Sequence, residues 1–223
     1  MRRAIVDPAA SRSDMGRPPT TALLRCGLVA APVFSGVVLL QALTRPGYDL
    51  ARMPLSLLAL GPFGWIQTVN FLVGGALVMA CALGVSRALA SRSGAAASIL
   101  LLLYGGGLAA AGVFPADPLP GAAPTASHRP ADMSWHADLH GLAFAVAQLG
   151  LTLGCAVLAV WFARHGRRGL AGLSAAAAVL TPALVFVGFS SPSIIGLAFF
   201  LTAVVGMGWL ALVAWALTPR SDA

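Results

Sequence analysis

Two histidines lie four residues apart in WHADLH, residues 135–140, with Asp138 between them. Side chains at i and i+4 share one face of a helix, so His136 and His140 could hold one metal ion or pass a proton. The zinc-protease pattern HExxH has the same histidine spacing, but here Ala137 stands where that pattern requires glutamate. The stretch is therefore not that motif, and a third ligand must come from another segment.

Candidate third ligands precede the two histidines. Asp49, Asp117 and His128 each lie in a connection between apolar stretches. Two histidines and one carboxylate suit zinc or iron, so His136, His140 and Asp117 form the predicted set for zinc or another divalent metal. Two other interpretations fit the same residues. One is a proton relay, and the other is a solvated His136 beside a His140 that only hydrogen-bonds a neighbouring loop.

A helix that begins near Pro130 would place Asp132, His136 and His140 on one face, because each is four residues from the next. Asp132 and His140 would then be about 12 Å apart along the helix axis. Ligands of one ion lie about 2 Å from it, so Asp132 cannot share an ion with His140.

The elements that must position these residues are membrane-spanning helices. Of 223 residues, 58% are hydrophobic and 9% are charged, and the mean hydropathy is +0.86, values typical of membrane proteins. The predicted fold is all-α, a polytopic membrane bundle of six transmembrane helices, each near the roughly 20 residues that cross a bilayer. These helices are predicted at about 22–44, 64–86, 95–114, 137–163, 169–189 and 193–217.

One transmembrane domain, 22–217, lies between two polar tails. Residues 1–21 contain proline and charged residues without periodicity, which predicts a disordered cytoplasmic tail, and residues 218–223 form a second cytoplasmic tail. The first apolar stretch is too long for a signal-peptide core, so it is predicted to remain as the first helix.

The distribution of arginine predicts the orientation of the bundle. With both termini in the cytoplasm, 11 of the 14 basic residues lie on the cytoplasmic side, and Arg45, Arg52 and Arg129 lie outside. Such an excess is typical of the cytoplasmic loops of membrane proteins. The net charge of +7 therefore indicates membrane topology, and nucleic acid is not a predicted partner.

Polar residues gather near the predicted extracytoplasmic ends of the helices. Gln67 and Asn70 share a face of the second helix, and Gln148 lies two turns below His140. Polar groups in hydrocarbon usually face the bundle interior or a watery cavity, so their distribution predicts an outward-facing polar vestibule. The alternative is that these amides only hydrogen-bond between helices.

Small residues recur on two helix faces. Gly27, Ala31 and Ser35 are spaced by four residues in the first helix, as are Gly150 and Gly154 in the fourth. Such faces let helices approach closely, either within one bundle or between two copies. A homo-oligomer through these faces is therefore a prediction alongside intramolecular packing.

Three stretches carry a resemblance to a known family. They are YDLARMPLSLLALGPFGWIQTVNFLVGG at 48–75, AAGVFPADP at 110–118 and HADLHGLAFAVAQLG at 136–150. Together they resemble the domain of unknown function 998 family of multi-helix bacterial and archaeal membrane proteins. The resemblance implies a six-helix fold in the plasma membrane of a prokaryote, and it brings no agreed activity. It implies these matching positions: Ser56, Trp65, Phe114, Pro115, Asp117 and His140.

Four functions are open at this point. The leading hypothesis is a vestibule that binds a small molecule, lipid head group or ion. The second is a metal-dependent membrane hydrolase, in which a metal on His136, His140 and Asp117 activates water to attack a lipid. The third is a transporter and the fourth a structural partner, with the lipid bilayer as the surrounding partner in every case. The candidate vestibule residues are Ser56, Asn70, Asp117 and His140.

Overall fold

The computed structural model describes residues 18–118 and 133–219, which form six long α-helices and one short 3-10 helix. All six α-helices are long and apolar enough to cross a bilayer, which confirms the predicted all-α fold. The observed boundaries differ from the predicted ranges by only a few residues. The elements are α2 (Thr20–Thr44), η1 (Leu55–Ala59), α3 (Gly64–Leu89), α4 (Arg92–Val113), α5 (Trp135–Arg164), α6 (Arg168–Ser190) and α7 (Ile195–Leu217).

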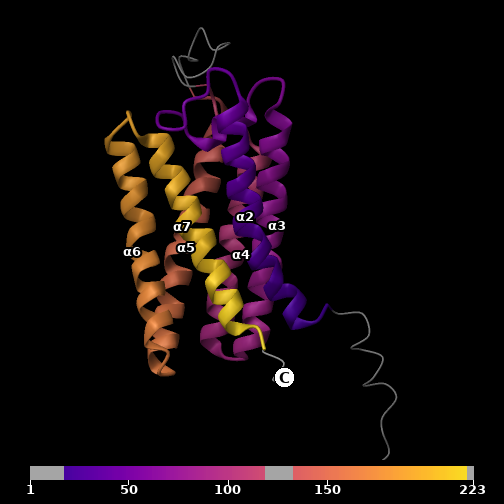
Figure 1. Cartoon of the computed structure of the whole chain (residues 1–223), viewed down its shortest axis with the longest axis vertical. Coiled ribbons are helices and arrows are strands. Elements are labelled where there is room, and N and C mark those ends of the chain that lie inside the picture. Colours follow the sequence, from indigo (N-terminus) through magenta and orange to yellow (C-terminus); the bar gives the residue numbers. More distant parts are fainter. Residues whose placement is uncertain (1–17, 119–132, 220–223) are drawn as a thin grey trace, which may run out of the picture.

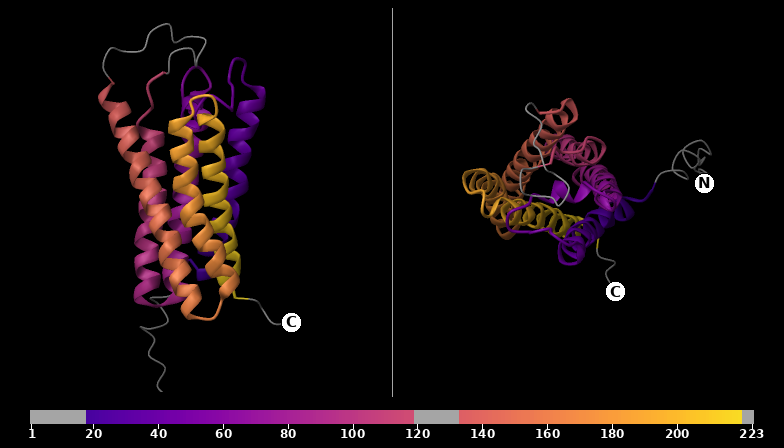
Figure 2. Two further views of the ribbon diagram at one scale, coloured as in Figure 1. Left: turned by 90° about the vertical axis from the view of Figure 1, so that its left-hand side faces the viewer. Right: turned by 90° about the horizontal axis from the view of Figure 1, so that it is seen from above.

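The six α-helices run side by side and close into a ring (Figures 1 and 2). Each helix packs against its neighbours in sequence, and α7 packs against α2 to complete the ring. The α2–α3 connection, the last turn of α4 and the first turn of α5 lie at one end, here called the loop end, where η1 packs against α2, α3 and α7. The opposite end, here called the arginine end, carries Arg87, Arg92, Arg164 and Arg168.

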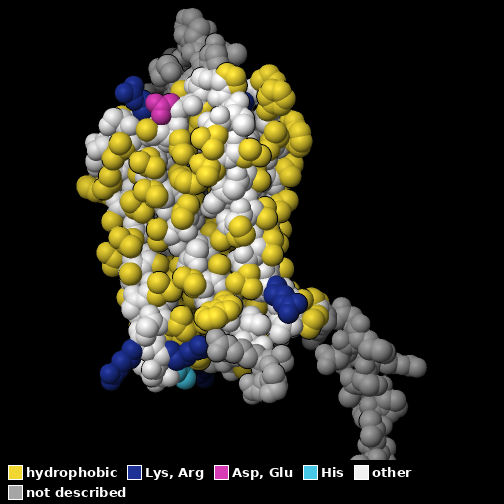
Figure 3. Space-filling model, in the orientation of Figure 1, with side chains coloured by type: hydrophobic (Ala, Val, Ile, Leu, Met, Phe, Trp, Pro, Cys, Tyr) yellow, Lys and Arg dark blue, Asp and Glu magenta, His cyan; other side chains and the backbone are white. Residues whose placement is uncertain are grey.

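The flank of the bundle is apolar. In the face that Figure 3 shows, hydrophobic side chains cover the flank and charged side chains lie toward the two ends. Trp65 and Trp135 are exposed at the loop end, and Trp215 is exposed at the arginine end. Exposed apolar helices with tryptophans at both ends indicate a lipid bilayer environment.

Close helix packing depends on glycine. A Cβ atom on Gly75 of α3 would lie 2.5 Å from the Gly105 carbonyl oxygen of α4, and one on Gly150 of α5 would lie 2.5 Å from the Leu100 carbonyl oxygen. A Cβ atom on Gly27 of α2 would lie 2.5 Å from Cys81 Sγ of α3. The small faces around Gly27 and Gly150 are therefore used inside the bundle, and a homo-oligomer stays a prediction.

The segment before α3 enters the ring instead of forming a surface loop. The Arg45 guanidinium donates hydrogen bonds to the carbonyl oxygens of Leu58 and Leu60. The Tyr48 hydroxyl donates to the Met53 carbonyl oxygen at 2.8 Å, and burial raises the pKa of that phenol above its ordinary value. These bonds hold η1 against the helices around it.

The α3–α4 connection is only two residues long. Ala90 has a φ of +42°, in the left-handed region that is unfavourable for residues with a Cβ atom. Ser91 then caps α4, since its hydroxyl oxygen accepts a hydrogen bond from the Gly94 amide at 3.1 Å.

We expect Ala90→Gly to raise the free energy of unfolding by about 0.5–1 kcal/mol, because glycine adopts positive φ without steric strain. Thermal denaturation in detergent, followed by circular dichroism, measures the effect. The matched control is Ala88→Gly in the exposed last turn of α3. It should lower stability by about the same amount, because glycine is unfavourable inside a helix. A loss of stability in Ala90→Gly would contradict the expected strain.

Candidate functional site

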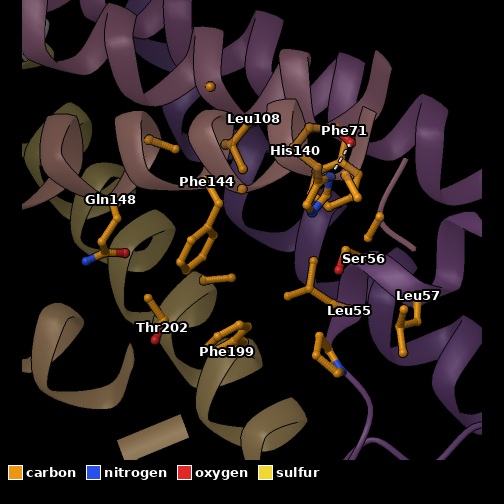
Figure 4. A pocket seen from close by; sticks show the side chains of 18 of the residues that line it. Leu55, Ser56, Leu57, Phe71, Leu108, His140, Phe144, Gln148, Phe199 and Thr202 are labelled. Atoms are coloured by element: carbon orange, nitrogen blue, oxygen red, sulfur yellow. Dashed lines mark hydrogen bonds between the residues drawn. The ribbon is translucent and has the colours of Figure 1, made fainter. Parts of the chain in front are cut away.

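A cavity of about 330 Å³ lies in the loop-end half of the ring. All six α-helices and η1 contribute to its wall, and most of the lining side chains are apolar. In Figure 4, His140 and Ser56 lie at one end of the cavity, and Gln148 and Thr202 lie at the other. Leu108 and Phe144 are among the apolar side chains between them.

The structure brings three of the four candidate vestibule residues to this cavity. Ser56, Asp117 and His140 line its loop end, whereas Asn70 does not line it. The sequence predicts a polar vestibule, but the observed wall is apolar over most of its area. Apart from Tyr104, its polar side chains lie at the two ends.

Asn70 belongs instead to a buried cluster of three amides between α2 and α3. Its Nδ2 donates to the Phe34 carbonyl oxygen at 3.1 Å and to Gln67 Oε1 at 3.3 Å. Gln41 Nε2 donates to the same Gln67 oxygen at 2.8 Å. These amides hydrogen-bond between helices, and this explains why the side of the cavity formed by α2 and α3 is apolar.

His140 is held by the carboxyl-terminal end of α4. Its Nδ1 lies 2.8 Å from the Phe114 carbonyl oxygen and 3.2 Å from the Ala111 carbonyl oxygen. Carbonyl oxygens only accept hydrogen bonds, so Nδ1 carries a proton and Nε2 of the neutral ring is an acceptor. Nε2 has no hydrogen-bond partner among the described residues, which leaves it available to a molecule in the cavity.

Ser134 lies directly before α5 and hydrogen-bonds to Asp117, which lies just after α4. Its hydroxyl donates to Asp117 Oδ1 at 2.6 Å, and its amide donates to Asp117 Oδ2 at 2.8 Å. The same hydroxyl oxygen lies 2.8 Å from His136 Nδ1 and accepts from the Ala137 amide, so Ser134 also caps α5. Sequence reasoning missed Ser134, although a serine directly before an apolar helical stretch is a known capping signal.

Helix α5 begins at Trp135, two residues before the predicted start at 137. Ser134 has extended backbone angles, φ −71° and ψ 150°, and Met133 is not helical. The hydrogen bonds of Ser134 to Asp117 hold it in this capping conformation. Two of the other acid and histidine candidates, Asp132 and His128, lie outside the described residues.

The predicted metal ligands lie near one another without forming a ligand set. His136 Nδ1 and Asp117 Oδ1 are 3.9 Å apart, and the Ser134 hydroxyl bonds to both. In the part of the chain that the structure describes, no three His, Cys, Asp or Glu side chains are grouped so as to hold one ion. The nitrogen left for an ion is Nε2 in both His136 and His140, because both Nδ1 atoms are hydrogen-bonded. Zinc or another divalent metal on His136, His140 and Asp117 stays a prediction.

Asp49, the remaining candidate ligand, is used within its own turn. Its Oδ2 lies 3.7 Å from Arg52 Nε, and its Oδ1 accepts a hydrogen bond from the Ala51 amide at 2.9 Å. It is absent from the cavity lining.

Gln148 and Thr202 lie at the far end of the cavity, and Tyr104 also belongs to its lining. Gln148 Nε2 donates to Thr152 Oγ1 at 3.1 Å, and Thr202 Oγ1 donates to the Ala198 carbonyl oxygen at 2.9 Å. Sequence reasoning singled out Gln148 but not Thr202. A threonine in an apolar helix commonly bonds to its own backbone, so Thr202 gave no distinctive signal.

A family model described as Protein of unknown function (DUF998) matches residues 28–216 of the chain. The matched residues make up most of the sequence. The chain belongs to DUF998. Comparison with curated proteins and with solved structures found no match. For this DUF998 protein the comparisons therefore give a family and no activity.

The match extends through α6 and most of α7, two helices that lie beyond the three stretches that carry the sequence resemblance. Of the matching positions in this DUF998 protein, Ser56, Asp117 and His140 line the cavity. Phe114 supplies the carbonyl oxygen that binds His140, and the Pro115 carbonyl oxygen lies 3.3 Å from His136 Nδ1.

We expect Ser134→Ala to lower the free energy of unfolding by about 2–4 kcal/mol, because it removes a helix cap and a hydrogen bond to a carboxylate. Ser91→Ala is the matched control, since Ser91 caps α4 and has no acidic partner among the described residues. It should cost only about 0.5–2 kcal/mol. Thermal denaturation of both variants in detergent tests this, and equal losses would show that the Asp117 contact contributes nothing.

Proposed function

We propose that this protein binds an amphipathic small molecule in the cavity. The apolar part of the molecule lies among phenylalanine and leucine side chains, and its polar group lies at His140, Ser56 and Asp117. The observation that carries the proposal is a largely apolar cavity whose loop end combines a carboxylate, a hydroxyl and an imidazole. Ligand sites in proteins commonly combine an apolar wall with a few converging polar groups.

The size of the cavity limits the ligand. Its volume of about 330 Å³ is near the lower bound of typical ligand sites. It therefore suits a single alkyl chain or a molecule of similar bulk.

The polar groups at the loop end favour a ligand with hydrogen-bond donors. His140 Nε2 is an acceptor, and the Asp117 carboxylate is an acceptor when ionised. The Ser56 hydroxyl makes no hydrogen bond among the described residues, so it can pair with a ligand hydroxyl or amide. Lipid tails are as apolar as leucine, so a ligand already dissolved in the bilayer gains little from burying its chain. Recognition over bulk lipid then depends mainly on these polar groups.

The arginine distribution supports an extracytoplasmic position for the loop end. The cavity would then face the outer leaflet of the plasma membrane, with both chain termini in the cytoplasm. No contact among the described residues favours the hydrolase or the transporter hypothesis, and both stay predictions from the sequence.

Filling the cavity tests the proposal. We expect Ala203→Phe, which adds a ring to the cavity wall, to weaken binding of radiolabelled monododecanoylglycerol to the purified protein about tenfold or more. The matched control is Ala145→Phe on α5, which is exposed and absent from the cavity lining. It should bind as the wild type does. Equal affinity of Ala203→Phe and the wild type would refute binding in this cavity.

Ser56→Ala tests the polar end separately. It removes a hydroxyl that has no hydrogen-bond partner among the described residues, so thermal stability should stay unchanged. Affinity for monododecanoylglycerol should fall about fivefold, the effect of losing one hydrogen bond of about 1 kcal/mol. Unchanged affinity would place the polar group of the ligand elsewhere.

A further inference from the structure

Helix α6 completes the ring between α5 and α7. Helix α5 packs against α4 and α6, and α7 packs against α6 and α2, with no extensive contact between α5 and α7. Helix α6 must therefore cover the space between them. Yet α6 is the least buried of the six spanning helices.

The side-chain hydrogen bonds that join α6 and its first cap residue to α7 lie toward the arginine end. Trp209 Nε1 of α7 donates a buried hydrogen bond to Ser174 Oγ at 2.9 Å, and Arg167 donates to the Ala216 carbonyl oxygen. Beyond Pro182, toward the loop end, Gly188 is the one buried residue of α6. Figure 2 shows that α5 leans away from α6 and α7 toward the loop end.

Three phenylalanines lie where the lining of the cavity reaches the exposed flank of the bundle, here called the opening. The Phe144 ring of α5 stacks on the Phe199 ring of α7 at 5.2 Å, and Phe189 of α6 contacts both rings edge-on at 6.4 and 5.2 Å. All three line the cavity, while Phe189 is also 63% exposed on the flank of the bundle. The rings therefore lie between the cavity and the surrounding bilayer.

Gly141 marks the edge of this opening on α5. It lines the cavity and is exposed, and an added Cβ atom would meet nothing within 4 Å. It follows His140 directly, so the opening lies beside the polar end of the cavity. Gly141 is six residues after Trp135, so it lies about 9 Å along the axis of α5 from the start of that helix.

We infer that a phospholipid of the surrounding bilayer inserts one acyl chain into the cavity between α5 and the α6–α7 hairpin, past Phe144, Phe189 and Phe199. The inference rests on the proposed binding function, and it adds the class of ligand and its route. The opening lies in the apolar flank, where acyl chains are the groups that surround the helices. Its position beside His140 lets the head group stay near the loop end while the chain enters the apolar part of the cavity.

The experiment uses the full chain in nanodiscs that contain a phosphatidylglycerol with a diazirine in the middle of one acyl chain. After illumination, mass spectrometry locates the cross-links. In the wild type we expect cross-links inside the cavity, at Thr202 and Phe199, as well as on the lipid-exposed surface at Leu43.

Gly141→Phe places a ring in the opening. We expect it to reduce cavity cross-links about fivefold or more and to leave Leu43 cross-links unchanged. The matched control is Gly36→Phe on α2, since Gly36 is also exposed with nothing within 4 Å of an added Cβ atom. It should leave both sets of cross-links unchanged. Undiminished cavity cross-links in a folded Gly141→Phe protein would overturn the lateral route.

A second variant keeps the inference testable if Gly141→Phe does not fold. Phe189→Ala removes two ring contacts from the opening, and cavity cross-links should appear about threefold faster under timed illumination. An unchanged rate would overturn the role of the rings.

The outcomes separate the inference from the proposed function. Suppose that the wild type shows no cavity cross-link to phosphatidylglycerol but binds monododecanoylglycerol in a manner sensitive to Ala203→Phe. The lateral phospholipid route is then wrong and the binding function stands. If neither ligand reaches the cavity, both are wrong.

Discussion

Backbone hydrogen bonding in a bilayer is the constraint on which this structure depends. Hydrocarbon offers no partners for peptide groups, so the chain crosses it as helices and admits irregular backbone only where protein groups satisfy it. Segment η1 meets that condition. The Arg45 guanidinium binds the carbonyl oxygens of Leu58 and Leu60, and the Tyr48 hydroxyl binds that of Met53. A charged side chain near the end of α2 therefore allows a Leu-rich segment to enter the ring.

The position of the cavity follows from unequal packing around the ring. Glycines such as Gly75, Gly105 and Gly150 bring α3, α4 and α5 into close contact. On the opposite side, α6 is little buried and α5 has no extensive contact with α7. Phenylalanines fill that side only in part, because large rings hold helices apart where glycine lets them touch. The positions of the cavity and of the opening beside Gly141 therefore follow from where the small residues lie.

The polar residues divide between two tasks. Gln41, Gln67 and Asn70 bond to one another and to backbone between α2 and α3, so they stabilise packing. His140 and Asp117 are each held by hydrogen bonds at the α4–α5 connection while also lining the cavity. Because the His140 ring is already fixed through Nδ1, little conformational freedom is lost when a ligand binds at Nε2.

The sequence by itself determined the six spanning helices, because runs of apolar residues long enough to cross hydrocarbon indicate that lipid surrounds them. It also singled out Asp117 and His140 by motif. Only the tertiary structure decided that Asn70 turns away from the cavity, and that Ser134 joins Asp117 to the start of α5. It likewise brought together phenylalanines from three helices. These outcomes depend on helix rotation and on contacts between residues distant in sequence, and hydropathy carries no information about either.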